Sequence, residues 1–338
     1  MRTSLLFPAA LVCSALVGQA PASETLVQRF NTNLPDVNKL LNDLKFQEAL
    51  DKTQALLPAQ SPVFVAKDPG TIERSLEEGR GFLALLKLKT SCVAALGQWE
   101  KAMEVNQSRV DYARALNADL DKATGALSAQ WIKVAEEGKS YIPQNEPKAA
   151  EIEKLLAALQ QDIKDVNEKK VKLDKKQLGE LQARAKEAPQ QEQQMLEIKA
   201  KIAAYKDALG RYKQFSNWVA ETHKQTAAMI KDAEEGLVKS QDTLKGQAAE
   251  IATFNTEQLK KNKKFKAEGS KKWVEAVMRD KTNLTKLETP RLQAQLLNRL
   301  LVLDPGEKNA AKALENIKQG RAPFFVEKAG KSKKAPRK

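Results

Sequence analysis

The chain has 338 residues and a formal charge of +14 at pH 7, with 30% charged and only 5% aromatic residues. Runs of alternating β-branched residues between glycine-rich turns are not evident, so the composition favours long helices and an all-α fold. Beyond the N-terminus no stretch reaches about 18 uninterrupted apolar residues, and no transmembrane span is predicted.

The first 22 residues have the organisation of an export signal. Arg2 supplies positive charge, residues 5–17 are largely apolar, and Ala20-Pro21-Ala22 is a small-x-small cleavage pattern. We expect cleavage after Ala22 and an exported bacterial protein, periplasmic or secreted. After cleavage only Cys92 remains, which excludes an intramolecular disulfide.

Three short segments share a pattern in which an aromatic or turn residue stands close to a small residue. The residues are Phe46 and Ala49 within 40–58, Gly97, Trp99 and Ala102 within 95–104, and Pro305 at the Leu-Asp-Pro junction within 300–314. The pattern resembles the tetratricopeptide repeat, which implies antiparallel helical hairpins with grooves that bind other proteins. Phe46 and Trp99 are 53 residues apart, whereas tandem repeats have a period of about 34. The resemblance therefore applies to separate hairpins.

A heptad pattern of apolar residues runs from Met195 to Phe254. Its eighteen positions, stepped by alternating three and four residues, carry no full charge. The positions are Met195, Ile198, Ile202, Tyr205, Leu209, Tyr212, Ser216, Val219, His223, Thr226, Ile230, Ala233, Leu237, Ser240, Leu244, Gln247, Ile251 and Phe254. We call these positions the seam, and they predict a coiled-coil helix.

The seam needs a partner helix, for which two arrangements remain open. Apolar stripes also follow residues 116–134 and 152–173, with Pro143 and Pro147 interrupting them, and Ala188-Pro189 breaks the chain before the seam. This favours an antiparallel coiled-coil hairpin within residues 109–266, with its tip at 187–190. The alternative is a parallel homodimer through the same seam, residues 195–254.

Residue patterns typical of catalysis are missing from the sequence. The single histidine, His223, is predicted to be a polar seam residue that fixes the register of the helices, with a pH switch as the alternative. Neither a nucleophile turn nor a phosphate-binding loop occurs. We therefore predict no enzymatic activity, no cofactor and no metal site.

Two short segments contain most of the excess positive charge. Residues 259–273 hold seven lysines against Glu268, and residues 321–338 hold seven basic residues against Glu327. In the first segment the residues predicted to bind an anionic surface are Lys260, Lys261, Lys263, Lys264, Phe265, Lys266, Lys271, Lys272 and Trp273. Lysines beside aromatic rings are typical of binding to an anionic polymer or membrane surface. The alternative is that they complement the dipole of a helix end and keep the protein soluble.

The sequence thus predicts five regions. They are a signal peptide at 1–22, a tetratricopeptide-like region at 23–108, a coiled-coil arm at 109–266, a C-terminal helical segment at 267–320 and a basic disordered tail at 321–338. The function predicted is that of a non-enzymatic protein-binding or scaffolding protein of the bacterial cell envelope. The alternative is an adaptor that binds an anionic polymer or membrane surface through the lysines of 260–272 and 331–338.

Overall fold

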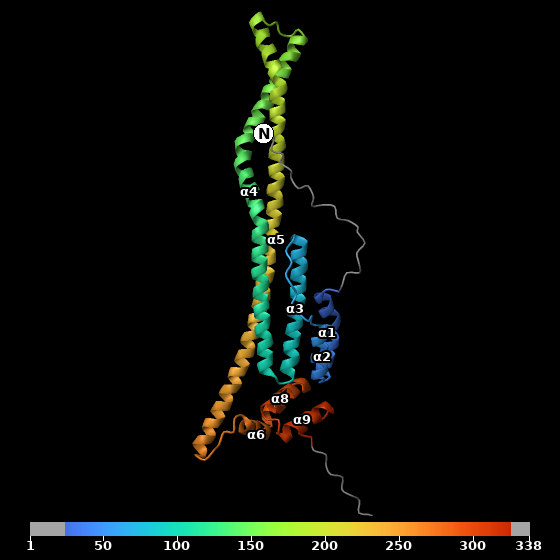
Figure 1. The fold of residues 1–338 in the computed structure, drawn as a ribbon, viewed down its shortest axis with the longest axis vertical. Helices are drawn as coiled ribbons and strands as arrows, with labels where there is room; N and C mark the ends of the chain where they lie inside the picture. The colour runs from blue at the N-terminus through green and yellow to red at the C-terminus, as the bar shows by residue number, and fades with distance from the viewer. Residues whose placement is uncertain (1–23, 326–338) are drawn as a thin grey trace, which may run out of the picture. The chain divides into compact units, whose positions relative to one another are not determined.

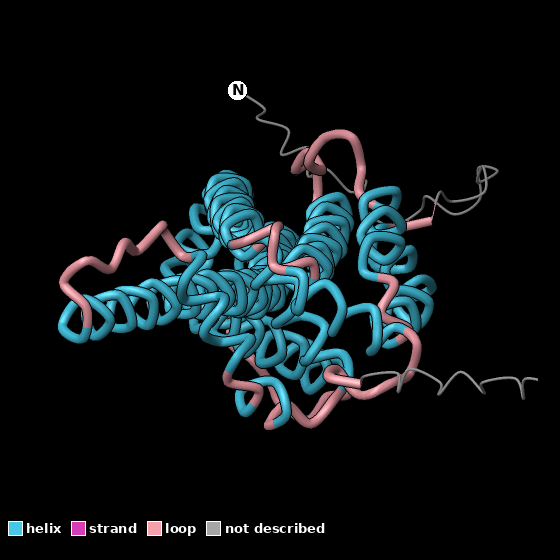
Figure 2. The backbone as a smooth tube through the Cα atoms, turned by 90° about the horizontal axis from the view of Figure 1, so that it is seen from below, coloured by secondary structure: helices cyan, strands magenta, loops and turns pink. Residues whose placement is uncertain are grey.

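The computed structural model describes residues 24–325, and residues 1–23 and 326–338 lie outside the described part. Over residues 24–325 the chain consists of helices, turns and loops, and no strand occurs there (Figure 2). The all-α prediction is therefore confirmed. The predicted signal peptide and most of the predicted basic tail, including 331–338, lie outside the described residues.

Two helices are much longer than the others. In chain order the bounds are α1 Leu26–Asn42, α2 Phe46–Leu56, α3 Pro69–Ala95, α4 Trp99–Asn167, α5 Lys175–Lys261, α6 Lys271–Arg279, α7 Thr282–Thr285, α8 Pro290–Leu303 and α9 Lys308–Lys318. None of these helices, in the range that the structure describes, combines the length and the apolarity needed to cross a bilayer.

The chain divides into two compact units. Unit 1 consists of residues 1–113 and 231–338, and unit 2 consists of residues 114–230. The long helices α4 and α5 contribute to both units, while the shorter helices belong to unit 1. Unit 2 is therefore inserted, in sequence, between the two segments that build unit 1.

In unit 1, helices α1, α2 and α3 pack side by side (Figure 1). The start of α1 is set by a capping box, in which the Thr25 hydroxyl accepts from the N–H of Gln28. Glycine at position 81 permits the close packing of α3 on α1. A Cβ at this position would lie 2.5 Å from the carbonyl carbon of Leu26.

The main hydrophobic core of unit 1 joins its two chain segments. Val37 and Cys92 from the first segment and Val274, Leu297 and Leu300 from the second are all fully buried in it. Burial of each large apolar side chain contributes about 1.5–3 kcal/mol. The stability of unit 1 therefore depends on segments that are far apart in the sequence.

Two turns of unit 1 have the same backbone geometry. Leu44 before α2 and Gly97 before α4 have φ angles of 61° and 75°. In each turn the N–H of the next residue donates to the carbonyl five residues earlier, which is the Schellman arrangement that ends a helix. The turn at Gly97 lies against α8, where a Cβ would be 2.5 Å from the amide nitrogen of Arg299.

Arg299 is 2% exposed and connects four segments of unit 1. Its guanidinium donates to both carboxylate oxygens of Glu100 at 2.7 and 2.6 Å, to Oε1 of Gln247 at 2.9 and 2.6 Å, and to the carbonyl of Gly97 at 3.1 Å. The Trp99 ring lies 4.8 Å from the guanidinium carbon. All five N–H groups of this arginine therefore have acceptors. Its hydrogen bonds hold the pKa of Glu100 below the usual value.

In unit 2 the segments of α4 and α5 run antiparallel. The hydroxyl of Thr226 donates to Asn117 at 2.6 Å, and farther along Lys199 pairs with Glu153 at 2.7 Å, so residue numbers rise on one helix as they fall on the other. Every seam position in unit 2 except Ser216 is buried or half-buried. The seam therefore faces inward.

His223 contacts α4 with both ring nitrogens. Its Nδ1 lies 3.3 Å from Oδ1 of Asp121, and its Nε2 lies 3.3 Å from Oγ1 of Thr124. These polar contacts occur at one level of the two helices, as expected of a seam residue that sets their register.

The tip predicted at residues 187–190 is wrong. Helix α5 continues through Pro189, and the turn between α4 and α5 occupies residues 168–174. Pro143 and Pro147 likewise lie inside α4. An internal proline costs a helix about 3 kcal/mol, but the side chain of Pro189 is exposed. Water can therefore solvate the carbonyl that it leaves without a partner.

The observed turn has sequence signals of its own. Lys169 has a φ of 57° and ends α4 in a Schellman turn. Asp174 caps α5, since its carboxylate accepts from the N–H of Gln177 at 2.7 Å and the Gln177 side chain accepts from the N–H of Asp174 at 3.0 Å. This reciprocal pair is a capping box, a stronger start signal for α5 than Pro189.

The first prediction concerns Gly97. Gly97→Ala puts a Cβ 2.5 Å from backbone atoms of α8 and forces alanine into a left-handed conformation. We expect a loss of about 3 kcal/mol or more in the free energy of unfolding, measured by denaturant titration. Gly246→Ala, in α5 with nothing within 4 Å of the new Cβ, is the control and should gain about 0.5–1 kcal/mol. Equal effects of the two changes would contradict the proposed packing.

The second prediction concerns Lys169. Lys169→Gly removes the cost of holding a lysine at positive φ and should raise the stability of the turn by about 1 kcal/mol. Thermal unfolding followed by circular dichroism measures this gain. Lys213→Gly, at an exposed position well inside α5, should instead lose about 1 kcal/mol, and a loss in both variants would place the turn elsewhere.

Candidate functional site

A groove of about 410 Å³ opens in unit 1 where α3, α4 and α5 meet beside α8. On each of the three long helices the lining residues recur at intervals of three or four, so that they share one helix face. They are Lys87, Thr90, Ser91 and Ala94 of α3, Trp99, Ala102, Asn106 and Arg109 of α4, Gly236, Lys239, Ser240 and Thr243 of α5, and Gln295 of α8.

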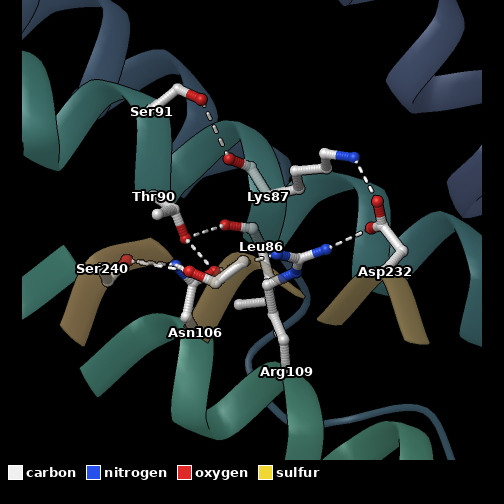
Figure 3. Close-up of polar contacts among 9 residues, drawn as sticks. Leu86, Lys87, Thr90, Ser91, Asn106, Arg109, Asp232 and Ser240 are labelled. Carbon is white, nitrogen blue, oxygen red and sulfur yellow. Dashed lines mark hydrogen bonds and ion pairs between the residues drawn. The ribbon is translucent and has the colours of Figure 1, made fainter. Parts of the chain in front are cut away.

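Asp232 holds two cations at one end of the groove (Figure 3). Its carboxylate oxygens lie 2.6 Å from Nζ of Lys87 and 2.6 Å from Nη2 of Arg109. Burial acts to raise the pKa of Asp232, but hydrogen bonding and charge from Lys87 and Arg109 outweigh it and keep the pKa below its ordinary value. The carboxylate therefore stays ionised at neutral pH and joins α3, α4 and α5.

Asn106 forms the second polar junction of the groove and is 2% exposed. Its Nδ2 donates to the carbonyl of Gly236 at 3.0 Å and to Oγ of Ser240 at 2.8 Å, while its Oδ1 accepts from Nη1 of Arg109 at 2.8 Å. The amide thus links α4 to α5 and orients the guanidinium. Thr90 lies within 3.3 Å of the same Oδ1.

The absence of a side chain at position 236 makes this junction possible. A Cβ on Gly236 would lie 2.8 Å from Nη1 of Arg109 and 3.2 Å from Oδ1 of Asn106. Any larger residue would push the buried guanidinium away from the carboxylate of Asp232. Glycine in α5 therefore costs some helix propensity but allows the polar cluster to form.

The hydroxyl groups of the groove bond to their own helices. Thr90, Ser91 and Ser240 each donate to the carbonyl four residues earlier, at 3.0, 3.2 and 3.0 Å. Their oxygens remain available as acceptors but are not arranged as nucleophiles beside a base. The groove thus offers fixed acceptors and donors around the apolar side chains of Ala94, Trp99 and Ala102.

Two donors in the groove lack partners in the described part of the chain. Nε of Arg109 is buried without a hydrogen-bond acceptor there, although the residue is only 3% exposed. Lys239 is exposed and makes no ion pair with another described residue. Because Asp232 neutralises only one of the three cations Lys87, Arg109 and Lys239, the groove has excess positive charge.

The lysines predicted to bind an anionic surface differ in their exposure. Lys260, Lys261, Lys263, Lys264, Lys266 and Lys271 are exposed, Phe265 and Lys272 are half-buried, and Trp273 is buried. Trp273 packs in the hydrophobic core at 8% exposure, so it does not belong to a surface patch. Its inclusion in the predicted surface is therefore incorrect.

The residues predicted from the repeat-like pattern lie mostly at helix contacts. Phe46 and Ala49 in α2 and Ala102 in α4 are buried in the core, and Gly97 is buried in its turn. Trp99 is half-buried between Arg299 and the groove. Pro305 is exposed in the turn before α9 and makes no contact with the groove.

Sequence reasoning missed Arg109 and Asp232, which lie on helices where most charged residues are exposed. Asn106 was not among the predicted site residues. The useful signal was in the seam itself, where Ser240 and Gln247 replace apolar residues. Both accept hydrogen bonds from buried groups of other helices, Asn106 and Arg299.

The third prediction concerns the carboxylate of the groove. Asp232→Asn leaves the buried Arg109 without its anion and should cost about 2 kcal/mol of unfolding free energy. The lowered pKa of Asp232 means that its contribution is complete above the unfolded-state value of about 3.9 and is lost as the pH falls through the folded-state value.

Denaturant titrations at several pH values measure both effects. The variant should lose less stability than the wild type on acidification through this range. Glu48→Gln, which removes an exposed pair with Lys45, should change stability by less than about 1 kcal/mol. Equal losses for the two variants would contradict a structural role of the Asp232 pair.

No protein-family model, curated protein or solved structure matches this chain. The function of the groove is therefore inferred from its own residues.

Proposed function

We propose that this is a non-enzymatic protein-binding or scaffolding protein of the bacterial cell envelope. The groove of unit 1 would hold a segment of the partner protein, and unit 2 would act as a coiled-coil arm. The observation that carries this proposal is the groove itself, which places apolar side chains among fixed polar groups and unmatched cations. Apolar and polar groups arranged in this way can bind a segment of another protein, and binding of this kind requires no catalytic residues.

The chemistry of the groove suggests what the partner segment contains. Trp99 and Ala94 offer apolar contact area, while the exposed ammonium group of Lys239 makes no ion pair with another described residue. A segment with an apolar side chain next to a carboxylate would complement both features. Trp99 is held by Arg299, so the apolar wall is already ordered before a partner binds.

The local geometry of the hairpins supports the tetratricopeptide-like interpretation. Phe46 and Trp99 each begin a helix two residues after a residue of positive φ, Leu44 in one turn and Gly97 in the other. The small residues three positions after the aromatic ones, Ala49 and Ala102, are buried. Tight helix packing at a small residue is the physical basis of such hairpins.

Contacts within unit 2 support a coiled-coil arm formed by one chain rather than by a homodimer. The seam residues Thr226 and His223 contact Asn117, Asp121 and Thr124 of α4. These polar groups already have partners in the same chain. A second chain at this level of the seam would have to displace them.

Placement in the cell envelope depends on the export signal predicted at residues 1–22, which lies outside the described residues. Release of a shortened mature chain into the periplasm or medium is the expected result. Sequencing the N-terminus of the exported protein would test whether it begins at Ser23.

The fourth prediction tests the groove as the binding site. Ala94→Leu fills part of the groove with a larger side chain from a half-buried position. We expect capture of the partner protein from envelope extract, followed by titration with the purified partner, to weaken by about tenfold or more. The fold should be kept, as judged by thermal unfolding.

Ala249→Leu is the matched control, because Ala249 is exposed on α5 and does not line the groove. This variant should bind as the wild type does. A partner that binds Ala94→Leu and the wild type equally would rule out the groove as the binding site.

A further inference from the structure

The lysines between α5 and α6 form a second charged surface, separate from the groove. Helix α5 ends at Lys261 and α6 begins at Lys271, and in Figure 1 the last part of α5 runs away from α3 and the start of α4. We call residues 259–271 the lysine turn. Its exposed lysines are Lys260, Lys261, Lys263, Lys264, Lys266 and Lys271.

The exposed lysines of the lysine turn differ from several other lysines because they have no carboxylate partner among the described residues. Elsewhere Lys87 pairs with Asp232 at 2.6 Å and Lys199 pairs with Glu153 at 2.7 Å. Across residues 24–325 none of the six exposed lysines of the lysine turn makes an ion pair. The only carboxylate in the turn, Glu268, lies 4.0 Å from Lys272 instead. The positive charge of the turn is therefore not neutralised by the protein.

The dipole of α5 accounts for only part of this charge. Lys260 and Lys261 stand in the last turn of the helix, where a cation stabilises the partial negative charge of the C-terminus. Lys263, Lys264 and Lys266 lie beyond the helix end, where this effect fades. Helix stabilisation therefore leaves the later lysines unexplained.

Apolar side chains accompany the lysines. Leu259 is 46% exposed immediately before them. Phe265 stands among them and is half-buried, with its ring edge-on to Phe254 at 6.3 Å. Cations with partly exposed apolar side chains suit a lipid surface, since the lysines contact phosphate groups while the apolar groups enter the headgroup boundary.

We propose that the lysine turn binds an anionic phospholipid surface. The lysines provide most of the affinity, and Leu259 adds an apolar contact that a soluble polyanion does not use. None of the groove residues takes part, so this binding is independent of the protein-binding function.

The fifth prediction uses the full chain and vesicles of phosphatidylcholine with or without phosphatidylglycerol. The wild type should sediment with the anionic vesicles only, and the binding should weaken steeply as salt is added. Replacing Lys260, Lys261, Lys263 and Lys264 by Gln should lower the partition coefficient by about 100-fold or more. Ala94→Leu should bind vesicles as the wild type does.

The matched control removes the same charge from the turn of unit 2 and the start of α5. Lys169, Lys172, Lys175 and Lys176 are also exposed, and their replacement by Gln should change vesicle binding by less than about threefold. Equal losses in both quadruple variants would assign the binding to net charge alone and overturn the proposal. So would failure of the wild type to bind anionic vesicles.

Leu259→Ser separates lipid from a soluble polyanion. It should weaken binding to anionic vesicles by about threefold or more and leave binding to polyphosphate unchanged. If vesicle binding is unaffected by Leu259→Ser and polyphosphate competes fully, the turn is a polyanion site and the lipid proposal is wrong.

Discussion

A guanidinium group shielded from water must find an acceptor for each N–H, and Arg299 does so by fixing four segments of unit 1 together. Glu100, Gln247 and the carbonyl of Gly97 come from α4, α5 and the turn before α4, while the arginine itself belongs to α8. Removing the Glu100 carboxylate would leave an uncompensated buried charge, at a cost of about 3–5 kcal/mol. The same helices form the groove walls, so the shape of the groove depends on this interaction.

The sequence indicated which side of a helix is buried. It said much less about which residues of other helices that side contacts. Heptad spacing correctly identified which side of α5 faces inward, and glycine at position 97 marked a turn because few other residues tolerate its φ of 75°. The position of the hairpin turn was missed because Pro189 looked like the stronger signal. A proline only disfavours a helix locally, whereas the Asp174 capping box and the Lys169 turn together end one helix and begin the next.

The heptad periodicity of the sequence could not predict the groove. Arg109 and Asp232 lie 123 residues apart in sequence, and neither occupies an apolar stripe. Which carboxylate meets which guanidinium depends on the register between α4 and α5, and a heptad pattern leaves that register open by whole repeats. Identical residue types also have different roles: Lys87 is neutralised by Asp232, whereas Lys263 and Lys264 make no ion pair with any residue in 24–325. The number of lysines therefore says little about function until their partners are known.

The insertion of unit 2 between the two segments of unit 1 has a kinetic consequence. Val37 and Leu297 belong to the same core of unit 1 but lie on opposite sides of residues 114–230 in the sequence. They can come into contact only when the two ends of that intervening segment are close together. Closing an unstructured loop of that length costs on the order of 4 kcal/mol in chain entropy. The hydrogen bond from Thr226 to Asn117 lies near the ends of unit 2, so an already formed helix pair removes most of that cost. Folding should therefore begin at the turn of residues 168–174 and proceed along α4 and α5, and the core of unit 1 should condense last.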